Sequence, residues 1–83
     1  MDEKIIAEFV KDRNMCLEDF VINDNLEGYR EHCKRWGMFY PKDEIIFKVG
    51  LYKAVQEVPE LSEEVKQMAR SKCIILGFNP EMR

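Results

Sequence analysis

The fold is decided by the stretch DEIIFKVGLYKAVQEV, residues 43–58. Its apolar residues surround most of a helix instead of forming one stripe, which predicts a central helix that is the most buried in the protein. Asp43 is the expected N-cap, and Pro59 closes the segment. Gly50 costs about 1 kcal/mol relative to alanine inside a helix. We therefore expect a close helix–helix crossing at Gly50, where a side chain would not fit.

A short apolar connection, Met38-Phe39-Tyr40-Pro41, leads into this helix. Pro41 disfavours the helical conformation at Tyr40, so a new element begins after it. If residues 43–58 occupy the centre of the molecule, the turn before them faces outward. The sequence therefore predicts that Phe39 and Tyr40 are exposed, and exposed aromatic residues in a loop mark a candidate binding surface.

Helices are expected on both sides of the central one. Upstream, Asp24 or Asn25 caps a helix with an apolar stripe, and Gly37 provides the positive φ that ends it. Downstream, Ser62 caps a helix that Gly77 ends in the same way. The buried stripe of this last helix is expected to contain Val65, Met68, Ala69, Cys73 and Leu76.

Residues 2–22 carry a helical stripe of apolar side chains that begins at Ile5 and resumes at Leu17, with Asp2 as the N-cap. Arg13-Asn14 interrupts the stripe, so the segment is either one bent helix or two short ones. Together these patterns predict an all-α protein. We expect a compact array of four or five short helices around one core, in a single domain over residues 1–83 whose last five or so residues are flexible.

Size, composition and charge exclude several classes of protein. The chain has 83 residues, 46% hydrophobic and 35% charged, which is typical of one globular domain. No apolar run approaches the roughly 18–20 residues of a membrane span, and the acidic start at residues 1–4 is unlike a secretory signal. We therefore expect a cytoplasmic protein that does not contact a membrane. The net charge of −3 divides into −5 over residues 1–27, +3 over residues 28–56 and −1 over residues 57–83, and we expect this asymmetry to steer association with charged partners.

The sequence contains no recognisable catalytic, cofactor-binding or metal-binding motif. Cys16, Cys33 and Cys73 lack zinc-finger spacing and are expected to be reduced. His32 and Cys33 are adjacent and point about 100° apart on a helix, which disfavours chelation. His32 is flanked by charged residues and is interpreted as a surface residue, which only Cys16 or Cys73 could approach through the fold. The prediction is a non-enzymatic protein without a cofactor or a metal.

The strongest indication of function is a basic and aromatic cluster over residues 29–42. Arginine, tryptophan and tyrosine are enriched at the hot spots of protein interfaces. The alternative interpretation is that Tyr29 and Trp36 belong to the core while the basic residues face water. The predicted partner-binding residues are Arg30, Lys34, Arg35, Trp36, Phe39, Tyr40 and Lys42.

A set of short stretches around the turn and the central helix carries a resemblance. They are Lys34-Arg35-Trp36-Gly37, Pro41-Lys42-Asp43-Glu44, Phe47, Gly50 and Lys53-Ala54. The chain resembles, over about residues 28–77, small uncharacterised proteins encoded by phages and integrative elements of Gram-positive bacteria. That setting includes anti-CRISPR proteins, which are short, often acidic and non-enzymatic, and act by occupying a Cas nuclease. The resemblance implies an inhibitor that binds a Cas nuclease or its guide complex.

Two other functions are compatible with these patterns. A helix ending at Trp36, a turn over residues 37–42 and a helix from Asp43 fit the outline of a helix-turn-helix DNA-binding regulator. Against it, residues 45–58 are apolar nearly all round, and a negative net charge weakens attraction to phosphate. The apolar excess of that segment also favours a homodimer, because it leaves one more face than a four-helix array covers. A protein-binding module is the leading hypothesis, with nucleic acid as the second class of partner.

Overall fold

Four helices make up the fold in the computed structural model, which describes residues 2–79. They are α1 (Glu3–Asn23), α2 (Leu26–Arg35), α3 (Glu44–Val55) and α4 (Glu63–Ile75). The described residues contain no strand, so the predicted all-α array is confirmed with four helices. The N-terminal segment is one continuous helix and not two.

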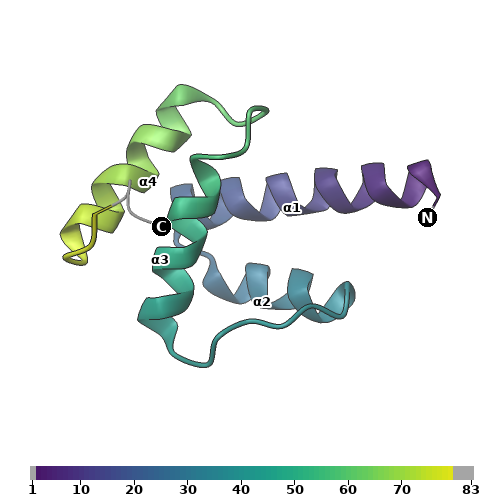
Figure 1. Ribbon diagram of the computed structural model, residues 1–83, viewed down its shortest axis with the longest axis horizontal. Coiled ribbons are helices and arrows are strands. Elements are labelled where there is room, and N and C mark those ends of the chain that lie inside the picture. The colour runs from purple at the N-terminus through teal and green to yellow at the C-terminus, as the bar shows by residue number, and fades with distance from the viewer. Residues whose placement is uncertain (1, 80–83) are drawn as a thin grey trace.

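The helices form two pairs that cross each other (Figure 1). α2 packs along α1, and α4 packs on α3. α3 crosses the C-terminal half of α1, and α4 also contacts α1. The N-terminal half of α1 extends beyond α3 and α4, so α2 is its only neighbouring helix in the part of the chain that the structure describes (Figure 1).

Each helix begins at a side chain that accepts a hydrogen bond from a backbone N–H of the first turn. Asn25 caps α2, while Asp24 adopts the left-handed conformation that ends α1, with φ 56°. Gly37 and Gly77 have positive φ values of 65° and 89°, as predicted for the residues that end α2 and α4. The remaining N-caps are the predicted Asp2, Asp43 and Ser62.

α1 continues through Arg13-Asn14 without a break. There, Nε and a terminal nitrogen of Arg13 donate to Oδ1 of Asn14 at 3.2 and 3.0 Å, so this acceptor is engaged by a side chain. At the C-terminal end of α1, Lys72 of α4 donates to the Val21 carbonyl oxygen and to the Asp24 carboxylate. A cation is favourable at this end of a helix, and it joins α1 to α4.

The core lies where α1, α3 and α4 meet. Phe20 of α1 has no exposed surface, and its ring stacks on that of Tyr52 at a centroid distance of 5.0 Å. The predicted central position of α3 is confirmed for the side that faces these helices. The buried side chains of α3 are Phe47, Val49, Leu51, Tyr52 and Val55.

The other side of α3 is exposed, which corrects two expectations. Ile45 and Ile46 in its first turn are 51% and 59% exposed, so the helix is not buried all round. Gly50 lies at the surface, and a Cβ atom at this position would meet no atom within 4 Å. The expected helix crossing at Gly50 is therefore wrong, because α1 and α4 pack against other sides of α3. Met68, expected in the buried stripe of α4, is also 37% exposed.

Three further features of the chain bear on the sequence predictions: its cysteines, the apolar length of its helices and its C-terminal end. Cys16, Cys33 and Cys73 are free cysteines, and Cys33 and Cys73 are buried. Within residues 2–79, no helix is both long enough and apolar enough to cross a bilayer. The predicted flexible end lies outside the described residues from position 80 onward.

Candidate functional site

One carboxylate of α1 holds the end of α2. Oδ2 of Asp12 accepts hydrogen bonds from Nδ1 of His32 at 2.7 Å and from Nε1 of Trp36 at 3.0 Å, and the Arg35 guanidinium also donates to it. Because an ionised carboxylate only accepts, Nδ1 of His32 carries a proton in this arrangement. Three donors therefore converge on one oxygen and fix the position of α2 along α1. These residues and their neighbour Cys16 are named the Asp12 cluster: Asp12, Cys16, His32, Arg35 and Trp36.

His32 has no exposed surface, which corrects the expectation of a surface histidine. Its ring packs against those of Phe9 and Tyr29, at centroid distances of 5.4 and 5.1 Å. Nε2 has no hydrogen-bond partner among the described residues. A buried imidazole without any partner is unfavourable, so the bond to Asp12 makes this position tolerable. The charged neighbours of His32 in the sequence face solvent because each helical residue turns by about 100°.

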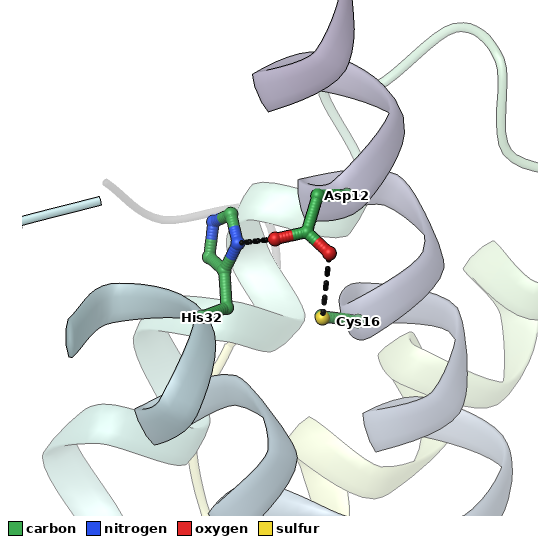
Figure 2. Close-up of side chains that lie close together, drawn as sticks. All are labelled: Asp12, Cys16 and His32. Atoms are coloured by element: carbon green, nitrogen blue, oxygen red, sulfur yellow. Dashed lines mark hydrogen bonds and ion pairs between the residues drawn. The ribbon is translucent and has the colours of Figure 1, made fainter. Parts of the chain in front are cut away.

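Cys16 completes a compact group of three side chains that carry polar or ionisable atoms. It lies four residues after Asp12 on the same face of α1, with Sγ 3.9 Å from Oδ1 of Asp12. Figure 2 shows the carboxylate between the thiol and the imidazole, with one oxygen toward each. The ligand atoms of Asp12, Cys16 and His32 all lie within 4.8 Å of one another. Of the two cysteines that the sequence allowed to approach His32, Cys16 is the one that lies near it.

The charge states of the cluster disfavour acid–base and nucleophilic chemistry near neutral pH. The hydrogen bond from His32, with smaller contributions from Trp36 and Arg35, lowers the pKa of Asp12 from 3.8 to about 2. Burial, assisted by the charge of Asp12, raises the pKa of the Cys16 thiol above its ordinary value of 9.0. The carboxylate therefore stays ionised and the thiol stays protonated. Neither group is ready to exchange a proton or to attack a substrate.

The predicted basic partner-binding residues do not form one uncompensated positive group. Lys42 is exposed in the connection between α2 and α3. Each of the other three lies beside an acidic residue, so its charge is partly compensated. These ion pairs are Arg30–Glu27 at 2.8 Å, Lys34–Glu31 at 3.9 Å and Arg35–Asp12.

The predicted aromatic residues divide between packing and exposure. Trp36 is half-buried, and its ring meets that of Phe9 edge-on at 5.2 Å. Tyr40 is also half-buried and stacks on Phe47 of α3 at 5.3 Å. Phe39 is 103% exposed, so its whole side chain is in solvent. The predicted exposure is confirmed for Phe39 and is wrong for Tyr40, whose ring anchors the turn on α3.

Phe39 belongs to an apolar surface that extends from α1 to α3. A hollow of about 460 Å³ lies where the N-terminal half of α1 faces the end of α2. A second hollow of about 220 Å³ lies between the turn and α3. Met38 lines both hollows, so they lie on either side of this residue. The residues of this surface, named the Met38 surface, are Ile5, Ile6, Phe9, Trp36, Met38, Phe39 and Ile46.

Only Trp36 and Phe39 of this surface are among the residues predicted from the sequence. Ile5, Ile6 and Phe9 form part of a helical stripe, and such a stripe does not say which neighbour covers it. The lengths of the two helices indicate that part of this stripe is left uncovered. α1 has 21 residues and its partner α2 has 10, so α2 cannot cover the whole apolar face of α1. The sequence also gives an indication of the Asp12 cluster. Asp12 and Cys16 are four residues apart, which places both side chains on one face of a helix.

Comparison with protein-family models, with curated proteins and with solved structures finds no match to this chain. The two candidate sites are the Asp12 cluster and the Met38 surface, and both rest on contacts within this molecule. Trp36 belongs to both, because its indole nitrogen binds Asp12 and its ring lines the larger hollow.

Proposed function

We propose that this protein is a non-enzymatic protein-binding module whose partner docks on the Met38 surface. The observation that carries the proposal is the full exposure of Phe39, which lines one of two apolar hollows that share Met38. Large contiguous apolar patches are uncommon on monomers and are typical of interaction sites. Phenylalanine, tryptophan and methionine are also enriched at the centres of protein interfaces.

Two aromatic side chains at the Met38 surface are held in place within the protein. The hydrogen bond to Asp12 orients Trp36, and the contact between Tyr40 and Phe47 anchors the turn next to Phe39. Ordering a side chain on binding costs roughly 0.5–1.5 kcal/mol. Because Trp36 and the turn are already ordered, that cost is avoided for them when a partner docks.

The resemblance to proteins of mobile genetic elements supports a narrower form of the proposal. In this form the partner is a Cas nuclease or its guide complex, and the protein acts as an inhibitor by occupying it. Lys42, two residues before the first helical residue of α3, is exposed, so it favours an acidic group on the partner beside an apolar anchor.

Two features favour a protein partner over duplex DNA. The connection between α2 and α3 has eight residues, 36–43, whereas the turn of a helix-turn-helix motif has three or four. The first turn of α3 exposes Ile45 and Ile46, where a recognition helix needs polar side chains for base edges. A protein partner is therefore the proposal, and binding to duplex DNA is the alternative that the experiment below separates from it.

The proposal predicts that polar substitutions on the Met38 surface weaken partner binding and leave the fold intact. We expect the double variant Ile6→Ser with Phe39→Ser to lose at least about tenfold in affinity, because truncating a hot-spot residue typically costs more than 1 kcal/mol. The measurement is affinity capture from a bacterial host lysate. It is followed by titration of the captured protein, of a purified Cas nuclease with and without its guide, and of duplex DNA.

The matched control is the double variant Met15→Ser with Ile75→Ser. These two side chains are 62% and 81% exposed and lie outside the Met38 surface, so the control removes as much exposed apolar surface elsewhere. A partner retained by the control and lost by the surface variant supports the proposal. Equal binding by both variants would contradict it, and salt-sensitive binding to DNA alone would favour the regulator instead.

A further inference from the structure

We infer that Asp12, Cys16 and His32 form a binding site for a divalent transition-metal ion, with Zn²⁺ as the best match. The inference is independent of the proposed function. Its basis is that a carboxylate, a thiol and an imidazole from two helices bring their ligand atoms within 4.8 Å of one another. In a tetrahedral zinc site with bonds of about 2.0–2.3 Å, neighbouring ligand atoms are roughly 3.3–3.8 Å apart. The atoms therefore need to move by only about 1 Å to surround an ion.

The donor set selects the class of metal. Thiolate and imidazole ligands suit Zn²⁺ and other transition metals of intermediate softness, whereas Mg²⁺ and Ca²⁺ require oxygen ligands. One carboxylate and one thiolate also supply two negative charges, which neutralise a dication. With three protein ligands, the fourth position of the ion is left for water.

Metal binding displaces a proton from each of two ligands, Cys16 and His32. Binding requires Cys16 to lose its thiol proton to solvent and Nδ1 of His32 to give up its proton, which the neutral ring regains at Nε2. One proton is therefore released for each ion bound. Nε2 is buried without a partner, so placing a proton there is unfavourable. We consequently expect micromolar affinity rather than the much tighter binding of a structural zinc finger.

Arg35 competes with the ion for Asp12. Its guanidinium donates to the carboxylate oxygen that also accepts from His32. Its side chain is 55% exposed, so it can swing into solvent when the ion arrives. Removing this positive charge is expected to tighten metal binding by about fivefold, because once Arg35 has swung into solvent its repulsion is screened to that of like charges in water, about 1 kcal/mol at 4 Å, which is that fold-change.

The test is titration of the purified, reduced protein with Co²⁺ and Zn²⁺. Co²⁺ bound to a thiolate gives a charge-transfer absorption band, and Trp36, the only tryptophan, reports on Asp12 through its fluorescence. We expect one ion per chain, a charge-transfer band, and no response to Mg²⁺ or Ca²⁺. Cys16→Ala should abolish the band, the double variant Cys33→Ala with Cys73→Ala should keep it, and Arg35→Gln should bind more tightly.

Circular dichroism separates the loss of a metal ligand in Cys16→Ala from the loss of the fold. Cys16 is only half-buried, so its replacement is a mild change that circular dichroism can check. Saturable binding that depends on Cys16 and is strengthened in Arg35→Gln supports the site. The inference is overturned by the absence of saturable binding to the wild type, by a band that survives in Cys16→Ala, or by a band that vanishes only when the other two cysteines are removed.

Discussion

Replacing Phe20 by alanine is expected to lower the free energy of unfolding by about 4 kcal/mol. This is a larger loss than we expect for alanine at Asp12, Met15 or Glu8. Phe20 has no exposed surface and stacks on Tyr52, so it joins α1 to α3 at the centre of the core. The substitution loses both the transfer free energy of the ring and the contacts around the cavity left behind. A domain of this size is stable by only roughly 5–10 kcal/mol, so the variant should be near the limit of folding.

Urea unfolding followed by circular dichroism measures this change. The matched control is Met15→Ala, which removes an apolar side chain from the same helix at a position that is 62% exposed. The control should stay within about 0.5 kcal/mol of the wild type. If Phe20→Ala were as stable as Met15→Ala, the α1–α3 contact would not be the centre of the core.

Replacing Asp12 by alanine is expected to lower the free energy of unfolding by about 3 kcal/mol. The substitution leaves the Nδ1 proton of the fully buried His32 without an acceptor and removes the partner of the Trp36 indole. The Arg35 contact adds little, because that side chain is mostly exposed. Glu8→Ala is the control, since Glu8 is exposed one turn earlier on the same helix and should change stability by less than about 0.5 kcal/mol.

The stabilisation by Asp12 depends on pH in a predictable direction. Its pKa is about 2 in the folded protein and 3.8 ordinarily, so the ionised carboxylate contributes its full stabilisation above about pH 4. That contribution is lost as the pH falls toward 2. Urea unfolding near pH 6 and near pH 2 should therefore show a wide gap between wild type and Asp12→Ala at the higher pH and a narrower one in acid. A gap of constant width would contradict the role given to the ionised carboxylate.

The parts of the fold set by local chemistry follow from the sequence. Asp43 and Ser62 cap helices, and Gly37 and Gly77 end them with positive φ, because each of these roles needs one residue type at one position. The continuity of α1 through Arg13 is not predictable in this way. The apolar stripe is interrupted at Arg13-Asn14, and whether a helix passes through such an interruption depends on the packing of the residues on either side.

The candidate sites depend on tertiary contacts, which single-sequence patterns do not contain. The apolar residues of α3 indicate a buried helix, yet Ile46 is exposed because α1 and α4 cover only part of its circumference. His32 appears polar and exposed among charged neighbours, but Asp12, twenty positions away, provides the partner that allows its burial. The outward position of Phe39 was predictable, because Pro41 ends any helical path through the turn.

The Asp12 cluster and the Met38 surface are coupled through Trp36. The bond from its indole to Asp12 sets the position of a ring that packs on Phe9 and lines the larger of the two hollows. A functional test of the surface therefore has to alter residues that Asp12 does not hold. Phe39 meets this condition, since its side chain lies wholly in solvent.

Site-specific photo-crosslinking from position 39 tests most directly whether the Met38 surface is the docking site. A photoreactive phenylalanine analogue replaces Phe39 in one version of the protein and Ile75, which is 81% exposed on α4, in another. We expect irradiation in host cells to join position 39 to one discrete protein of a different mass, with no such product from position 75. Products from position 75 alone, or from position 39 only to a second copy of this chain, would contradict docking of a protein partner on the Met38 surface.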